Sequence, residues 1–193
     1  IGAIGGEGAT DTLMAETADR RLTIASAARE ILADMGVKKV APRVASALLT
    51  IVREPVGDLS LRTPIAEWGD ALVKLDYTEP IDDLKAAAAV QSDPVIKDSL
   101  DSCVRRLQLL EENGDLVAAW ATASVSPFPD VRRLADRRLA EIGSRAAVRA
   151  ITTRLLRTDL PPEERADVLI AIGEARTQGA AELVERHLSD PAY

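Results

Sequence analysis

Hydrophobic residues in the segment 129–190 recur with a helical period in two successive blocks. Each block holds one apolar stripe, a glycine, a second apolar stripe and then a proline that begins the next block. The glycines are Gly143 and Gly173, and a glycine in the left-handed conformation ends a helix at no steric cost. The inward positions of the two blocks are Val131, Leu134, Ala135, Leu139, Ile142, Val148, Ile151, Leu155, Ala166, Leu169, Ile170, Ala180, Leu183, Val184 and Leu188. One helix pair cannot bury its apolar face alone, so we expect similar pairs to be stacked along the rest of the chain.

Residues 10–125 show three further helix pairs of the same design. A long first helix over 10–35 is predicted to end at Gly36, and its partner carries Pro42 in the first turn, where a missing N–H does little harm. The inward positions are Ala18, Leu22, Ala25, Ala28, Leu32, Met35, Val37, Val40, Val44, Leu48, Ile51, Ile65, Trp68, Leu72, Leu75, Ile81, Leu84, Ala88, Ile96, Leu100, Cys103, Leu107 and Leu110. The segment 116–125 is apolar nearly all round, which predicts a helix buried on several sides.

Five prolines mark a repeat of two helices. Pro64, Pro94, Pro129, Pro162 and Pro191 are separated by 30, 35, 33 and 29 residues. Helical repeats of this length stack into solenoids. The predicted fold class is therefore all-α, a right-handed α-solenoid whose roughly five helix pairs span residues 10–54, 62–92, 93–125, 129–158 and 161–190.

Composition supports this reading and narrows the partners. The chain has 193 residues, of which 47% are hydrophobic and 3% aromatic, which suits helices packed through small side chains. Its net charge of −7 argues against a general affinity for nucleic acids or for anionic membranes. No apolar run is long enough to cross a bilayer and no signal peptide is recognisable, so we expect a cytoplasmic location. The glycine-rich residues 1–9 are expected to be a flexible segment, and residues 10–193 a single domain.

Three stretches of the sequence resemble HEAT repeats. They are PDVRRLADRRLAEIG at 129–143, DPVIKDSL at 93–100 and the closing SDP at 189–191. The resemblance is to the short bacterial type of HEAT repeat that is also found in bilin-lyase-like proteins. It implies a stack of HEAT-like helix pairs and concerns the fold only, because the motif of this family marks structure and fixes no activity.

No group of residues forms a recognisable catalytic, metal or cofactor site. His187 is the only histidine and falls on an apolar stripe, which favours a packing role. Cys103 lies on the stripe between Leu100 and Leu107 and is expected to be an unreactive core thiol. Adjacent acids such as Asp82 and Asp83 point about 100° apart on a helix and do not converge as an acid–base pair. We therefore expect no cofactor and no metal.

Trp68 and Trp120 raise one enzymatic alternative. DNA glycosylases with HEAT-like repeats use tryptophan and aspartate in a basic groove, and Trp68 is followed two residues later by Asp70. However, residues 54–116 carry 14 acids and 6 bases, a net charge of −8 that would repel phosphate. Both tryptophans also occupy apolar stripes, so core packing is the better prediction.

The residues 129–160 stand out by their positive charge. They contain eight arginines and four acids, a net of +4 in a chain whose remainder is −11. Arg133 and Arg137 are four residues apart and share a helix face, as do Arg145 and Arg149. Solvated helix surface and a binding site for an acidic partner are both consistent with this cluster. We take these four arginines as the candidate binding residues.

From these features we expect a non-enzymatic scaffold or adaptor domain that binds a protein partner, one with an acidic segment, through the surface of the solenoid. One alternative is a bilin-lyase-like or HEAT-type DNA-repair enzyme, and another is a regulatory segment of a larger protein, whether or not that protein is attached to a membrane. The closing Asp190-Pro191 repeats the cap-and-proline signal of Asp93-Pro94. We therefore expect the chain to continue past Tyr193 or to self-associate through its C-terminal repeat.

Overall fold

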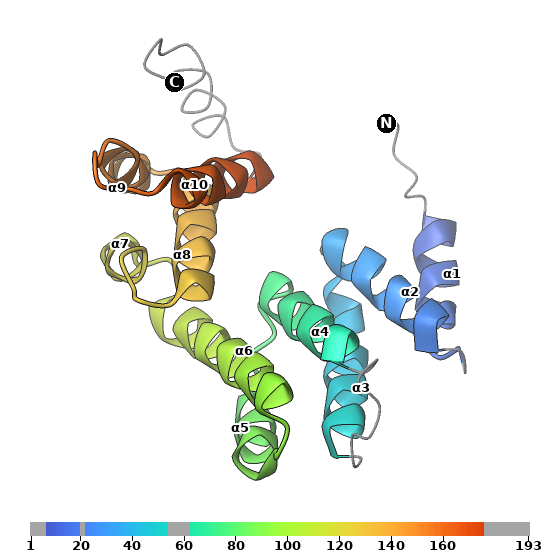
Figure 1. Cartoon of the computed structure of the whole chain (residues 1–193). Coiled ribbons are helices and arrows are strands. Elements are labelled where there is room, and N and C mark those ends of the chain that lie inside the picture. Colours follow the sequence, from blue (N-terminus) through green and yellow to red (C-terminus); the bar gives the residue numbers. More distant parts are fainter. Residues whose placement is uncertain (1–6, 20–21, 54–61, 176–193) are drawn as a thin grey trace. The chain divides into compact units, whose positions relative to one another are not determined.

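The computed structural model describes residues 7–19, 22–53 and 62–175. Within these residues it contains ten α-helices, one short 3-10 helix and no strand (Figure 1). The elements are α1 Glu7–Glu16, α2 Leu22–Asp34, η1 Lys38–Val40, α3 Ala41–Arg53, α4 Arg62–Lys74, α5 Ile81–Val90, α6 Pro94–Asn113, α7 Val117–Ala123, α8 Pro129–Ile142, α9 Arg145–Leu155 and α10 Pro162–Ala175. The predicted all-α solenoid class, built from paired helices, is confirmed.

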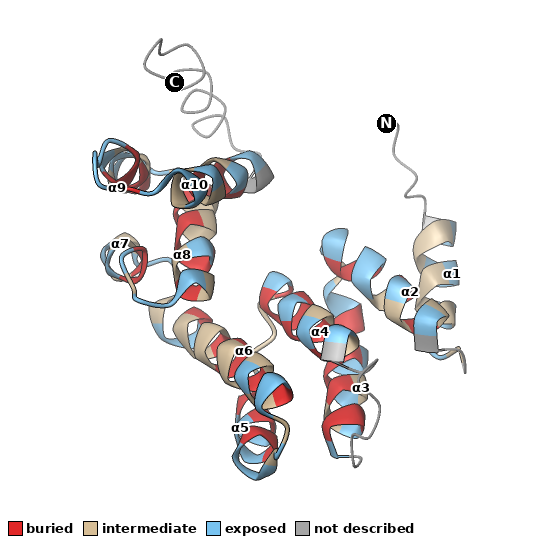
Figure 2. Cartoon of the chain, viewed as in Figure 1, coloured by how far each residue is buried: buried red, intermediate tan, exposed pale blue. Residues whose placement is uncertain are grey.

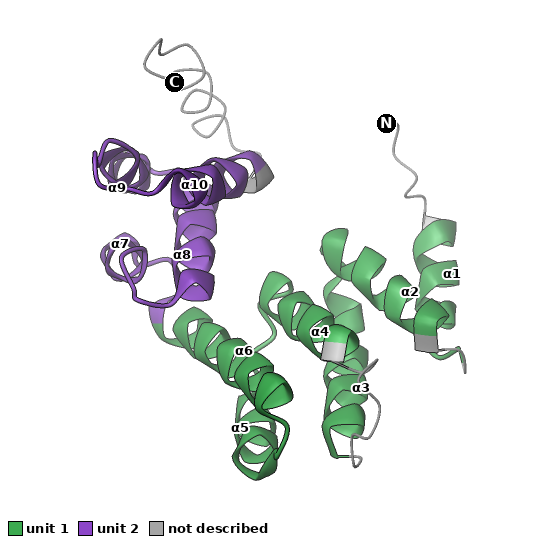
Figure 3. Ribbon diagram, viewed as in Figure 1, with its two compact units in different colours: residues 1–112 green, residues 113–193 purple. Residues whose placement is uncertain are grey.

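The helices form two compact units, residues 1–112 and residues 113–193 (Figure 3). Residues 1–6 of the segment that we expected to be flexible lie outside the described residues, and α1 begins at Glu7, three positions before the predicted start. The predicted last helix, His187 and the proposed self-association surface near Tyr193 also lie outside the described residues.

The core of the first unit lies where α2 and α3 pack against α4, with α5 against α3. Figure 2 shows the buried residues as stripes along the facing sides of these helices. The largest fully buried side chains are Leu32, Leu48, Ile65, Trp68, Leu72, Leu84, Ile96, Leu100 and Leu107, all at predicted inward positions. The helical period therefore located the core of this unit correctly.

The helix ends follow the chemistry that the sequence predicts. Gly36 and Gly143 have positive φ values of 71° and 59°, which a residue with a Cβ adopts only with strain. At the start of α6, the carboxylate of Asp93 accepts hydrogen bonds from the backbone N–H groups of Val95 (2.9 Å) and Ile96 (3.2 Å). These devices stop one helix and begin the next, and the cap at α6 pairs two backbone N–H groups of the first turn.

The single helix predicted over residues 10–35 is wrong, because the structure has two helices there, α1 and α2. No glycine or proline marks the break in the sequence. The end of α1 is fixed by Thr17, whose hydroxyl donates to the carbonyl of Met14 (2.7 Å) and accepts from Arg43 of α3 (2.7 Å). Met35, predicted to face inward, is 41% exposed. The break thus depends on a contact with α3 that is distant in sequence.

In the second unit, α8 contacts α7, α9 and α10. Trp120 is fully buried, and its indole N–H donates to the carbonyl of Gly114 (2.7 Å). The prediction that segment 116–125 is buried on several sides is wrong, because Leu116 is 64% and Val125 58% exposed. A seven-residue helix has only two turns, and here one face of it supplies the contact with α8.

The prediction for α10 is wrong in two respects. Gly173 lies inside this helix and not in a turn, and Ile170, predicted to face inward, is 58% exposed. The buried positions are Val168, Ala171 and Ile172. Residues 168–172 are all apolar, so the sequence offers two possible stripes, and packing on α8 selects one of them.

Candidate functional site

The four candidate arginines lie on two helices of the second unit. Arg133 and Arg137 belong to α8, and each has a carboxylate partner. The Nε of Arg133 is 3.8 Å from Asp167, and the Nε of Arg137 donates to Glu141 (2.8 Å). Arg145 and Arg149 belong to α9, are exposed, and have no carboxylate partner among the described residues.

The other arginines of the cluster are also neutralised within the protein. The ion pairs are Arg132–Glu164 (2.9 Å), Arg138–Glu141 (2.9 Å), Arg157–Asp159 (2.7 Å) and the buried pair Arg154–Asp136. Eight arginines lie between residues 129 and 160. Among them, Arg145 and Arg149 are the two whose guanidinium groups have no carboxylate partner among the described residues.

The exposed pair faces away from the core of its unit. Ala147, Ile151 and Leu155 make up the buried stripe of α9, together with the guanidinium of Arg154. Arg149 and Arg154 are five residues apart, which is about 140° around a helix. Arg145 opens the helix, where the first turn carries no acidic residue and the backbone dipole adds positive potential. This end of α9 is therefore an electropositive surface.

A buried polar cluster joins α8, α9 and α10, and we did not foresee it. Asp136 is 1% exposed and pairs with Arg154, which is 5% exposed and also donates to Glu164 (3.3 Å). Burial raises the pKa of Asp136 to about 6, and the positive charge of Arg154 opposes that rise. The buried pair of Asp136 and Arg154 links α8 to α9, and the contact of Arg154 with Glu164 extends this link to α10. In the sequence Asp136 is one acid among basic neighbours. Its burial and its ion pair with Arg154 depend on the packing of the neighbouring helices and could not be foreseen.

Trp68 and Cys103 take the packing roles that we predicted. Trp68 is 1% exposed, and its indole N–H donates to the hydroxyl of Ser26 (2.9 Å). Asp70, which the glycosylase alternative required, pairs with Arg106 (2.7 Å). Burial raises the pKa of the Cys103 thiol to about 12, so this cysteine is not a nucleophile near neutral pH.

The first unit has a shallow groove of about 360 Å³ between α3 and α5. Its polar rim includes Tyr77, whose hydroxyl donates to Glu79 (2.6 Å), and Asp83, 3.8 Å from Arg53. The hydrogen bond to Glu79 raises the pKa of Tyr77. The contact between Tyr77 and Glu79 is exposed to solvent and the raised pKa keeps the phenol protonated, so this pair indicates no reaction.

A second basic segment was missed at the level of sequence. Residues 20–53 contain seven bases and two acids, a net of +5, which exceeds the value for residues 129–160. The signal was present, but the chain as a whole is acidic and these bases are spread over two predicted helices. The structure brings two of them, Arg29 of α2 and Arg43 of α3, onto the same residue, Thr17.

No protein-family model and no curated protein matches the chain. Among solved structures it is similar to human deoxyhypusine hydroxylase in complex with glycerol, with 18% identity and a TM-score of 0.42. The similarity covers 97% of this chain and 80% of that one. At this identity and TM-score the likeness assigns no activity to the present chain.

The comparison does correct one expectation. We expected a non-enzymatic scaffold because a helical-repeat chain without a catalytic motif suggested one, but the protein that the chain resembles is named as an enzyme. A helical-repeat reading of the sequence is therefore no ground for excluding catalysis, and we do not keep that expectation.

Two findings concern membranes and metals. In the part of the chain that the structure describes, no helix combines the length and the apolar character needed to span a membrane. Among the same residues, no group of three or more histidine, cysteine, aspartate or glutamate side chains is placed to hold a metal ion.

Proposed function

We propose that the second unit binds an acidic segment of a protein partner through Arg145 and Arg149. The observation that carries the proposal is the ion pairing of this unit, in which five carboxylates pair with six arginines and leave these two without a carboxylate among the described residues. Guanidinium groups bind carboxylates in a two-pronged geometry, so a glutamate or aspartate side chain is the natural ligand. The proposal concerns binding and is independent of whether the chain also catalyses a reaction.

The same face of α9 also offers an apolar contact. Leu156 follows Arg149 by seven residues, which is two helical turns, and its side chain is 65% exposed. An exposed ion pair contributes only about 0.2–1 kcal/mol, so two arginines alone would bind weakly. A partner that places an apolar residue beyond its acids would gain affinity by covering Leu156. We therefore expect the ligand to combine acidic and apolar residues.

The proposal predicts binding that weakens with salt and depends on this pair of arginines. The probe is a fluorescein-labelled peptide in which glutamate alternates with leucine, and fluorescence anisotropy measures its binding. Wild-type protein should bind it with an affinity that falls as salt rises, because screening weakens exposed ion pairs. The double variant Arg145→Glu, Arg149→Glu should lose at least tenfold in affinity.

A matched control separates this site from the net charge of the molecule. Lys38→Glu, Lys39→Glu makes the same change of charge at two exposed residues of the first unit and should leave peptide binding unchanged. Equal loss in both double variants, or equal binding by the arginine variant and the wild type, would contradict the proposal. Tight binding of duplex DNA at physiological salt would show that phosphate, not an acidic protein, is the ligand of this surface.

We also propose that the helix pairs are HEAT repeats. The support lies in the first repeat of the second unit, where Pro129 begins α8, Val131 and Leu134 are buried, and Gly143 ends the helix in the left-handed conformation. These are the positions of the stretch PDVRRLADRRLAEIG that resembles the family. An experimental structure in which α8 and α9 do not form one helical hairpin would refute this assignment.

A further inference from the structure

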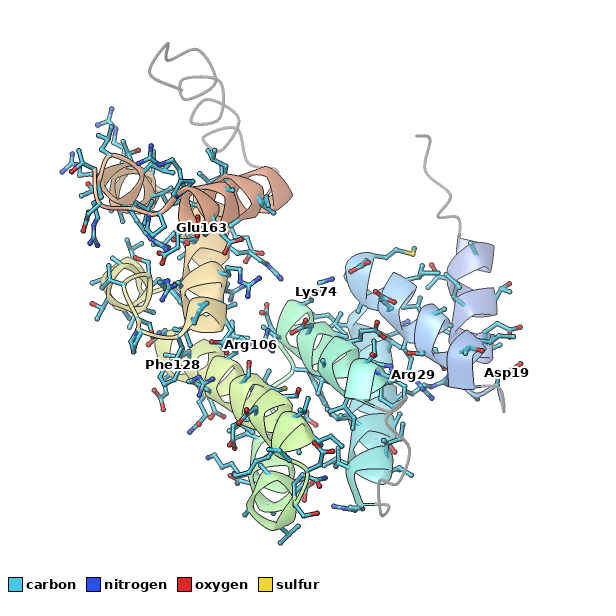
Figure 4. All side chains as sticks on the ribbon, viewed as in Figure 1. Asp19, Arg29, Lys74, Arg106, Phe128 and Glu163 are labelled. Atoms are coloured by element: carbon cyan, nitrogen blue, oxygen red, sulfur yellow. The ribbon has the colours of Figure 1, made fainter. Side chains whose placement is uncertain are left out.

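Two arginines of the first unit meet at the C-terminal end of α1. The Nη2 of Arg29 donates to the backbone carbonyl of Thr17 (2.7 Å), and the Nη1 of Arg43 donates to the hydroxyl of the same residue (2.7 Å) and to the carbonyl of Met14. Thr17 itself is 2% exposed. Figure 4 labels Arg29 at this place, among α1, α2 and α4. The two guanidinium groups are therefore held side by side by one buried residue.

The positive charge of this pair is not balanced within the described protein. Neither Arg29 nor Arg43 has a carboxylate partner among the described residues. Their hydrogen-bond acceptors are carbonyls and a hydroxyl near the end of α1, where the helix dipole supplies about half of one negative charge. Two full positive charges exceed that by about 1.5 charges. Capping of α1 thus accounts for the position of the arginines but not for the number of charges.

The environment of Arg29 makes the imbalance more costly. The face of the Trp68 ring, 4.8 Å from its guanidinium, attracts the cation, but the Nε of Arg29 is buried without a hydrogen-bond partner. Burial, and then repulsion by Arg43, lower the pKa of Arg29. Like charges near a surface of low dielectric constant repel strongly unless an anion lies between them. Arg43 is exposed, so an anion in solvent can reach the pair.

We propose that Arg29 and Arg43 form a binding site for a phosphate group. A phosphate carries about −1.5 to −2 charges at neutral pH and several acceptor oxygens, which matches two guanidinium groups with free N–H donors. A carboxylate would neutralise only one of the two arginines. The phosphate can be inorganic or part of a small phosphorylated molecule, and the chemistry recognised is the same. This site is in the first unit and does not depend on the function proposed for α9.

Inorganic phosphate on the intact chain tests the proposal. It should raise the melting temperature saturably, relative to sodium chloride at equal ionic strength, and it should change the fluorescence of Trp68, which lies against Arg29. The variant Arg43→Gln should weaken phosphate binding at least tenfold, with unchanged helix content by circular dichroism. The variant Arg53→Gln is the matched control, because Arg53 is an exposed arginine of the same helix and lies 3.8 Å from Asp83.

Each other outcome overturns the proposal. Phosphate that stabilises no more than chloride, or binds Arg43→Gln as well as wild type, shows that the arginines serve only the end of α1. Equal stabilisation by acetate shows a carboxylate site instead. Equal weakening in Arg43→Gln and Arg53→Gln shows an effect of net charge alone. If inorganic phosphate binds as proposed, phosphoserine and glucose 6-phosphate then distinguish a peptide-borne from a small-molecule source.

Discussion

Asp136 and Arg154 form the most deeply buried ion pair that the structure describes. Taking both groups out of water costs several kcal/mol for each ion, and their attraction offsets that cost only when the remaining polar atoms are also paired. Here Glu164 supplies a second acceptor for Arg154, but Oδ1 of Asp136 has no partner. This imbalance explains why burial dominates and the pKa of Asp136 rises to about 6.

The raised pKa predicts an unusual response to acid at this residue. Between about pH 6 and pH 4 the folded state keeps a proton on Asp136 that the unfolded state has released. Acidification in this window therefore stabilises the fold through this one group, by about 1 kcal/mol from pH 7 to pH 5. Urea unfolding of the wild type and of Asp136→Asn at both pH values measures the effect.

The comparison with the variant is necessary because other carboxylates titrate in both proteins. On going from pH 7 to pH 5, the free energy of unfolding of the wild type should rise relative to that of Asp136→Asn. An identical pH response in the two proteins would show that Asp136 has an ordinary pKa. A relative loss of stability in the wild type would show that Arg154 lowers its pKa.

At the scale of the helices, two glycines provide a sharp test of the observed boundaries. Gly36 has a φ of 71° after α2, whereas Gly173 lies inside α10, and an added Cβ would meet nothing within 4 Å at either position. The substitution Gly36→Ala should therefore destabilise the fold by about 1 kcal/mol, because the left-handed conformation strains alanine. Gly173→Ala should stabilise it by about 0.5–1 kcal/mol, because alanine favours a helix interior.

Chemical denaturation of the wild type and the two glycine variants measures the change in the free energy of unfolding, which should be a decrease for Gly36→Ala and an increase for Gly173→Ala. If Gly173→Ala is as destabilising as Gly36→Ala, Gly173 is a turn residue, as the sequence pattern indicated, and the helix boundary in the structure is incorrect.

The sequence predicted those features of the helices that depend on neighbouring residues. The cap at Asp93, the prolines at the starts of α6, α8 and α10, and the left-handed Gly36 and Gly143 are local effects. The sequence-based prediction was wrong where the end or the buried face of a helix depends on contacts with residues distant in sequence. At the end of α1, Thr17 accepts a hydrogen bond from Arg43 of α3, and the buried face of α10 is the one that packs on α8.

The candidate site was only partly predictable for the same reason. The arginine-rich segment 129–160 was visible in the sequence. The carboxylates that pair with several of these arginines, however, belong to other helices, so the sequence did not show which guanidinium groups remain without a partner. Arg133 is close to Asp167 of α10, and Arg132 is bound by Glu164 of the same helix. Composition alone does not separate the paired arginines from the unpaired ones. It also gave no sign that Arg29 and Arg43 lie close together in the structure.

At the scale of the whole molecule, the charge is strongly segregated along the chain. Residues 20–53 carry +5 and residues 129–160 carry +4, while the remaining residues sum to −16. One positive segment belongs to each compact unit. Each unit therefore has one segment of positive charge in a chain that is acidic overall. The two proposed sites are independent, and either can fail without the other.

The central claim is that Arg145 and Arg149 are the arginines of the second unit that meet an acidic partner. It is tested most directly by the NMR signals of the arginine Nε–H groups during titration with the glutamate–leucine peptide. The signals of Arg145 and Arg149 should shift together and saturably, and those of the ion-paired Arg132, Arg137 and Arg138 should remain in place. Shifts that appear first in the ion-paired arginines, or equally in all of them, would contradict the account.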